Sequence, residues 1–124
     1  MSLTTLGLII ASVCLSAIAQ VVLKAGMSGT RIVAAFARDT PVDVALAIIA
    51  EPLIWLGLTL YAVGAVVWLF VLAKVNVSLA YPFVGLGFLM TMGFAIAFLG
   101  ETVTPARAIG TCLVAGGVLL VALK

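Results

Sequence analysis

A stripe of polar residues runs along the first apolar segment of the chain. Ser16, Gln20 and Lys24 follow one another at intervals of four, which places all three on one face of a helix. Together they offer a hydroxyl, an amide and a cation, which are groups that would bind an anionic head group. Because polar groups inside a membrane need partners, we expect this face to point into a helix bundle or a cavity. A second interpretation stays open, in which Lys24 extends to the membrane surface and the other two side chains bond across helices.

Aromatic and small residues in the second and third apolar runs are further candidates. Tyr61 and Trp68 lie deep in the second run, where they would line a cavity. The third run carries Tyr81-Pro82 near its start, and Gly85 follows, a pattern that favours either a cavity wall or close helix packing. The predicted substrate-binding residues are therefore Ser16, Gln20, Lys24, Tyr61, Trp68, Tyr81, Pro82 and Gly85.

The sequence contains no catalytic or metal-binding constellation. It has no histidine, no acid pair at catalytic spacing and no glycine loop that would cradle a phosphate. We therefore expect no enzymatic activity, no cofactor and no metal. Cys14 and Cys112 both lie in apolar runs without metal-ligand spacing, so we expect buried free thiols. No Asp or Glu lies in the middle of an apolar run, whereas a proton-coupled exporter of cations needs a carboxylate within the membrane.

The composition makes lipid the main surroundings of these side chains. Of the 124 residues, 66% are hydrophobic and 8% are charged, too few charges to cover the surface of a small soluble domain. The net charge of +2 gives no reason to expect a nucleic-acid partner. Four apolar runs are long enough to cross a hydrocarbon core of about 30 Å, and they cover residues 3–27, 53–75, 79–100 and 106–123. We predict an all-α integral membrane protein with one four-helix transmembrane domain over residues 1–124.

Local signals predict where the helices begin. Thr104-Pro105 and Glu51-Pro52 each place a capping side chain before a proline suited to the first helical position. Pro82 lies in the first turns of the third run, where it removes a backbone hydrogen bond and loosens the helix.

The long first loop, residues 28–52, is expected to contain a short helix. Thr40-Pro41 followed by Asp43 is typical of a helix start with an acid in the first turn. The apolar content of Pro41 to Ala50 favours a helix at the membrane interface. The alternative is an extension of the second span with a kink at Pro52.

Basic residues are distributed unequally between the two sides of the predicted bundle. Lys24, Arg31, Arg38 and Arg107 lie on one side, and Lys74 and Lys124 lie on the other. The positive-inside rule then places the first loop in the cytoplasm, although the small difference leaves dual insertion open. Arg31 and Arg38 are predicted to attract an anionic head group to the surface.

Two glycines mark a helix contact in the fourth run. Gly110 and Gly117 lie seven residues apart on one face, a pattern that favours close helix packing within the chain or across a dimer.

Several of these stretches resemble a known family of membrane transporters. The chain resembles the four-helix branch of the drug/metabolite transporter superfamily, which includes small EamA-type proteins. Within it, the chain is most similar to subunits of the bacterial flippase for undecaprenyl phosphate-linked aminoarabinose. The matching stretches are Ser16-Ala-Ile-Ala-Gln20-Val-Val-Leu-Lys24, Leu56-Gly57, Val67-Trp68-Leu69, Val77-Ser-Leu-Ala-Tyr81-Pro82 and Gly100-Glu101-Thr-Val-Thr104-Pro105.

The resemblance implies a flippase subunit in the bacterial inner membrane. It implies a lipid-linked anionic substrate, such as a polyprenyl-phosphate-linked sugar, and surrounding membrane lipids as partners. It also implies a homodimer, or a heterodimer with a related four-helix subunit, in which Gly110 and Gly117 match a dimer-packing pattern. The small multidrug resistance proteins are similar too, but they carry a glutamate where this chain has Ser16.

Two other functions remain as alternatives. The first is export of cationic or small solutes, with a carboxylate supplied by a partner chain. The second is a non-transporting accessory role, in which the long first loop docks a glycosyltransferase or lipid-modifying enzyme.

Overall fold

The computed structural model describes residues 2–123, and every regular element within that range is helical. Four helices are long and apolar enough to cross a membrane, as predicted, counting the third span as Val77–Leu99. The elements are α1 (Leu3–Met27), α2 (Thr30–Ala37), α3 (Pro41–Ala50), α4 (Pro52–Leu72), α5 (Val77–Ala80), a 3₁₀ turn (Tyr81–Phe83), α6 (Val84–Leu99) and α7 (Pro105–Leu123).

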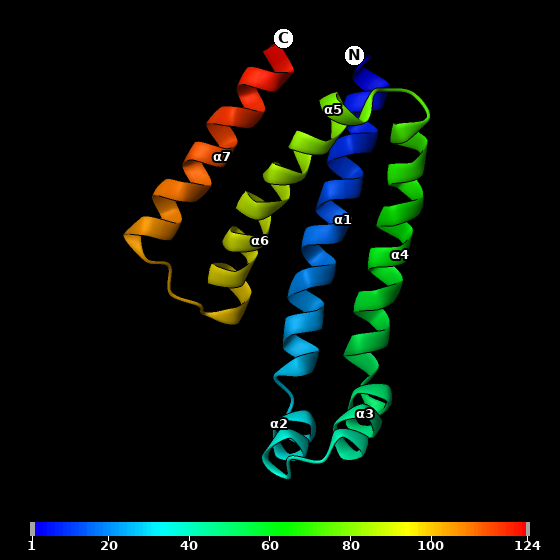
Figure 1. Cartoon of the computed structure of the whole chain (residues 1–124), viewed down its shortest axis with the longest axis vertical. Helices are drawn as coiled ribbons and strands as arrows, with labels where there is room; N and C mark the ends of the chain where they lie inside the picture. The colour runs from blue at the N-terminus through cyan, green and yellow to red at the C-terminus, as the bar shows by residue number, and fades with distance from the viewer. Residues whose placement is uncertain (1, 124) are drawn as a thin grey trace.

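Helix α1 is the centre of the arrangement. It packs along α4 on one side and along α6 on the other, whereas α7 packs mainly against α6 (Figure 1). The α2–α3 segment forms one end of the molecule, and the connection from α6 to α7 lies nearer its middle (Figure 1). The N-terminus and the link from α4 to α5 lie toward the opposite end (Figure 1).

Small residues allow α1 and α4 to approach each other closely. A Cβ added to Gly57 would lie 2.7 Å from side-chain atoms of Leu23, and one added to Gly26 would lie 2.9 Å from Ile54. The hydroxyl of Ser12 donates a 2.8 Å hydrogen bond to the carbonyl oxygen of Gly64 across this interface. Close approach and interhelical hydrogen bonds are the main means of joining helices in lipid, so these contacts make α1–α4 the firmest pair.

The predicted helix starts are confirmed. The hydroxyl of Thr104 accepts a 3.2 Å hydrogen bond from the backbone N–H of Arg107 in the first turn of α7. The carboxylate of Glu51 accepts one of 3.4 Å from the N–H of Leu53 at the start of α4.

The third span is interrupted near its beginning, as Pro82 predicts. The α-helical pattern stops at Ala80, passes through the 3₁₀ turn and resumes at Val84. At its other end the span closes at Gly100, whose φ of 66° is a left-handed conformation that glycine adopts without steric cost.

The first loop folds into a helical hairpin formed by α2 and α3. The prediction of a helix over Pro41–Ala50 is confirmed, and α2 is an additional helix that the sequence analysis did not predict. The two helices pack together around Ile32, Ala35 and Ala47, and Arg38 and Asp43 form a 3.3 Å ion pair. The position of α3 at the membrane interface stays a prediction.

Helix α3 is a separate element and not an extension of the second span. Glu51 is extended, with φ −87° and ψ 115°, and Pro52 cannot continue the hydrogen-bond ladder. The indole N–H of Trp55 donates a 2.7 Å hydrogen bond to the carbonyl oxygen of Ile49. This bond satisfies a carbonyl group at the end of α3, where the helical ladder has stopped.

The two cysteines differ in their surroundings. Cys14 is partly buried and contacts the sulfur of Met90 at 3.5 Å. Cys112 is exposed, so the prediction of a buried thiol is wrong for this residue. The reason is that the outer face of α7 has no helix beside it within the described residues.

Candidate functional site

Helices α1, α4, α6 and α7 surround a partly open cavity of about 820 Å³. The cavity exists because α7 leans on α6 and does not close against α1 and α4 (Figure 1). Its size lies within the usual range for small-molecule pockets, roughly 300–1,000 Å³.

One wall of the cavity is the polar face of α1. Ser12, Ser16 and Gln20 all line it, each four residues after the last. The hydroxyl of Ser12 is engaged with α4, whereas the amide of Gln20 has no hydrogen-bond partner among residues 2–123 and is exposed to the cavity. Gln20 is therefore able to donate and accept hydrogen bonds with a bound molecule.

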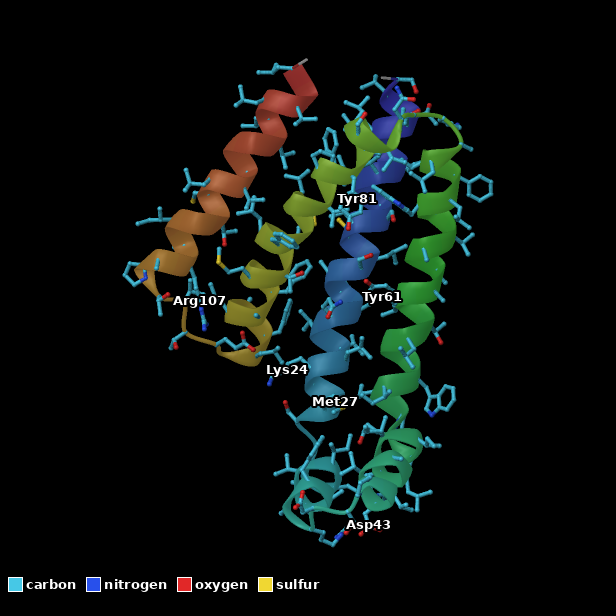
Figure 2. All side chains as sticks on the ribbon, viewed as in Figure 1. Lys24, Met27, Asp43, Tyr61, Tyr81 and Arg107 are labelled. Carbon is cyan, nitrogen blue, oxygen red and sulfur yellow. The ribbon has the colours of Figure 1, made fainter. Side chains whose placement is uncertain are left out.

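Aromatic side chains from α4 and from the third span also line the cavity. Tyr61 and Trp68 come from α4, and Tyr81 comes from the 3₁₀ turn that interrupts the third span. Tyr81 lies nearer the end of the molecule that holds the N-terminus, and Tyr61 lies nearer its middle (Figure 2). Such rings combine apolar surface with a polar tip, so this part suits the less polar portion of a ligand.

Charged residues line the other end of the cavity. Glu101 comes from the connection between α6 and α7, and Arg107 comes from the first turn of α7. Thr91, Thr102 and Thr111 add hydroxyl groups to the lining. From the sequence, Glu101 was noted only within a stretch that resembles the transporter family, and Arg107 only as an orientation charge. Neither residue was predicted to line a cavity. A possible signal was that Arg107 and Thr111 share one face of the fourth span.

The structure brings together five of the eight predicted substrate-binding residues. Those that line the cavity are Ser16, Gln20, Tyr61, Trp68 and Tyr81, together with Gly110, which was predicted for dimer packing. Their role in binding stays a prediction.

Three predicted substrate-binding residues lie outside the cavity lining. Lys24 is exposed near the end of α1 (Figure 2). Pro82 belongs to the 3₁₀ turn. Gly85 is buried at the contact between α6 and α7, where an added Cβ would lie 2.6 Å from Val114. The sequence left two positions open for Gly85, a cavity wall or a tight helix contact. The structure places it in a tight helix contact.

The remaining predicted residues lie at the surface of the chain. Arg31 and Arg38 are exposed on α2 and at its end, on the side of the molecule where Lys24 also lies. Gly117 has no atom within 4 Å of an added Cβ, so it makes no close helix contact within the chain. Lys124, used for the charge comparison, lies outside the described residues.

Comparison with known proteins shows a partial sequence match. The chain is 36% identical over 69 residues to a probable 4-amino-4-deoxy-L-arabinose-phosphoundecaprenol flippase subunit, ArnE, of Escherichia coli strain K12 / DH10B. The same identity and length hold for the protein of that name from Shigella boydii serotype 18. The chain resembles these flippase subunits. The match covers 54% of this chain and 62% of the relatives, so it spans less than two thirds of their length. No family model matches the chain, and no solved structure matches it significantly.

The similarity and the fold agree on the general class of protein. Four apolar helices of spanning length make this a multi-pass membrane protein. The names of the similar proteins describe a transporter subunit and not an enzyme. The resemblance predicted from the sequence is therefore confirmed at this level.

Proposed function

We propose that this chain is a subunit of a bacterial inner-membrane transporter that moves a polyprenyl-phosphate-linked sugar or a similar anionic lipid. The observation that carries the proposal is the partly open cavity with the polar face of α1 on one wall. A partly open cavity between helices would let a polar head group pass while its hydrocarbon tail stays in lipid. The similarity to flippase subunits supports the same class of substrate.

The polar lining of the cavity would replace water around the moving head group. Ser16 and Gln20 offer hydrogen bonds from α1, and Tyr81 offers a hydroxyl from the third span. Lys24, Arg31 and Arg38 would collect the phosphate at the membrane surface before it enters, because anionic groups concentrate near clustered basic residues. Among the described residues no Asp or Glu lies within the middle of a span, so movement would follow the substrate gradient.

The proposed transporter contains a second four-helix subunit, either another copy or a related chain. Helix α7 has one side against α6 and an outer side that carries exposed Ile109, Leu113 and Leu120. The open space beside Gly117 leaves room for another helix to approach closely. The word subunit in the names of the similar proteins supports an assembly of this kind.

Transport by two single variants tests the proposal. Gln20→Ala and Lys24→Ala should each slow the movement of a fluorescent polyprenyl-phosphate sugar across membranes that contain the protein, at unchanged expression. Thr59→Ala is a matched control, because the hydroxyl of Thr59 bonds only to the carbonyl of Trp55 in its own helix, outside the cavity. Full transport by both test variants would contradict the proposed function.

Export of cationic solutes is a second candidate, and one observation favours it. Glu101 lines the cavity and provides a carboxylate that a cation could bind. This function requires that the chain raise resistance to quaternary ammonium compounds and that export respond to a proton gradient. Resistance that disappears in Glu101→Gln would support export of cations over movement of lipids.

A further inference from the structure

Two segments that are far apart in the sequence bring opposite charges to one end of the cavity. On α1 the last residue of the lining toward the α2–α3 hairpin is Gln20, and Lys24 lies about one turn beyond it. From the third span, the lining continues into the connection between α6 and α7, which contributes Glu101. This end of the cavity, which we call the mouth, is therefore bordered by an ammonium and a carboxylate.

The register of α1 against α6 places these two residues at the same depth in the bundle. Both helices run from the end that holds the N-terminus toward the opposite end (Figure 1). The Sγ atom of Cys14 lies 3.5 Å from the Sδ atom of Met90, which is 76 positions later in the chain. Because all α-helices rise by the same amount per residue, the same offset places Lys24 level with Gly100, the residue before Glu101.

Lys24 also leaves α1 on the side that faces α6. Val13 marks this side, since a Cβ added to Gly87 of α6 would lie 3.3 Å from its Cγ1 atom. Lys24 follows Val13 by about three helical turns and so lies on nearly the same face. Figure 2 shows the Lys24 side chain on the side of α1 toward the lower end of α6. Depth and direction thus both bring Lys24 toward the connection that carries Glu101.

The two charges are not paired in this structure. Within residues 2–123 the one ion pair that forms is Arg38 with Asp43, on the α2–α3 hairpin. Lys24 and Glu101 are both exposed, and α6 diverges from α1 toward the mouth (Figure 1). The mouth is therefore open, with an unpaired cation and an unpaired anion beside it.

The segment that carries Glu101 is suited to movement. The chain is not helical between Leu99 and Pro105, and it turns at Gly100, whose φ is 66°. The helix that follows, α7, has 6% of its most apolar stretch buried inside the chain, and α6 is its main neighbour. The lower ends of α6 and α7 can therefore approach α1 without breaking a tightly packed contact.

We propose that Lys24 and Glu101 form an ion pair that closes the mouth of the cavity, and that the structure shows the mouth open. Exposed ion pairs are weak, so this contact would form and break reversibly. The closing contact goes beyond the proposed function, because it needs no substrate. An anionic substrate would nevertheless compete with Glu101 for Lys24, so its arrival would favour the open mouth.

A distance measurement across the mouth tests the proposal. Spin labels would be attached at Ser28→Cys and Ala106→Cys in the full chain, with Cys14 and Cys112 replaced by alanine, in lipid nanodiscs without substrate. Electron–electron double resonance should show a short and a long distance, for the closed and the open mouth. Raising the salt concentration should reduce the short population, because salt screens exposed charges.

Charge variants should change the ratio of the two distances. Lys24→Gln and Glu101→Gln should each lower the ratio of short to long distances by up to about fivefold, the scale of an exposed ion pair. The exchanged pair Lys24→Glu/Glu101→Lys should restore the short distance. Lys74→Gln is the matched control, because it removes an exposed lysine near the opposite end of the bundle and should leave the ratio unchanged.

Access to the cavity provides a second measurement. Thr91 lines the cavity, so a cysteine placed there in the same background reports on entry from water. A water-soluble maleimide should modify Thr91→Cys faster when Lys24→Gln or Glu101→Gln is also present. Lys74→Gln should leave the rate unchanged.

Two results would overturn the closing contact. The first is the same distance distribution in the wild-type pair, in Lys24→Gln and in Glu101→Gln. The second is a short distance that survives Lys24→Gln and disappears in Arg107→Gln, which would make Arg107 the partner of Glu101. Neither result would affect the proposed function, which is tested separately by lipid transport in Gln20→Ala. Failure of the wild-type chain to move the lipid would overturn that function and leave the closing contact in place.

Discussion

Helices α1 and α7 are both apolar spans, but they are held in very different ways. In α1, 28% of the most apolar stretch is buried inside the chain, compared with 6% in α7. Helix α1 contacts α4 and α6 along its length, whereas α7 has α6 as its main neighbour. The comparison indicates that the chain consists of a firm pair, α1 and α4, and a fourth span attached along one side.

The number of close glycine contacts explains the difference. At Gly26, Gly57 and Gly64 the helices α1 and α4 lie so close that an added Cβ would crowd atoms of the facing helix. Between α6 and α7 Gly85 has this role, whereas Gly110 and Gly117 have nothing within 4 Å. Because small residues set how closely helices approach in lipid, the firm pair should tolerate added bulk least.

The largest effect is expected from Gly57→Ala. The new methyl group would lie 2.7 Å from the side chain of Leu23 and 3.2 Å from its backbone nitrogen. We expect the free energy of unfolding in detergent to fall by about 1–3 kcal/mol through overpacking. Gly93→Ala is the matched control, since nothing lies within 4 Å of its added Cβ and its helix propensity improves. A Gly57→Ala variant as stable as the wild type would contradict the close α1–α4 contact.

Gly85→Ala should produce a smaller and more local change. Its methyl group would lie 2.6 Å from Val114 and 3.1 Å from Val118, both side chains of α7. We expect a loss of about 1 kcal/mol, because these side chains can shift and α7 is otherwise little constrained. Hydrogen exchange measured by mass spectrometry should rise in α7 and stay unchanged in α1 and α4. Faster exchange throughout the chain would show that α7 is held as firmly as the other spans.

Ser12→Ala probes the hydrogen bond within the firm pair. The variant loses the 2.8 Å bond to the carbonyl of Gly64. Because interhelical hydrogen bonds in membranes contribute on average about 0.6 kcal/mol, we expect a decrease of that order in the free energy of unfolding. Ser16→Ala, whose hydroxyl makes no hydrogen bond among the described residues, should change stability less. A larger loss for Ser16 than for Ser12 would contradict this ranking.

The smallest effect is expected outside both regions, at the α2–α3 hairpin. Asp43→Asn removes the ion pair with Arg38. The side chain of Arg38 is 57% exposed and that of Asp43 is 40% exposed. Exposed pairs contribute about 0–1 kcal/mol, so the unfolding midpoint should barely move at physiological salt. A loss comparable with that of Gly57→Ala would show that this pair holds the hairpin in place.

The spans were predictable from the sequence because each is a continuous apolar run, and capping residues and prolines mark where helices begin or are interrupted. Thr104-Pro105 marks the beginning of α7, and Pro82 marks the interruption of the third span. Helix α2 was missed because it has eight residues, too few for a strong periodic signal. It becomes stable by packing Ile32 and Ala35 against α3, a contact that only the folded hairpin reveals.

The site could be predicted in part, for the same kind of reason. The polar face of α1 follows from helical spacing alone, so Ser16 and Gln20 were identified correctly as neighbours on one face. The position of Arg107 and Glu101 in the cavity lining depends on the way α7 leans against α6, which no local pattern encodes. Gly85 was ambiguous for a similar reason, because its place in the sequence did not distinguish a cavity wall from a packing contact.

The position of the firm pair along the chain has a consequence for biosynthesis. Helices α1 and α4 precede α6 and α7 in the chain, and the Ser12–Gly64 bond joins residues 52 positions apart. Proteins tend to fold from the N-terminus during synthesis, so this pair can assemble before α6 and α7 are made. Helix α7 then inserts beside an assembled unit of α1, α4 and α6, with its outer side still available to a second chain.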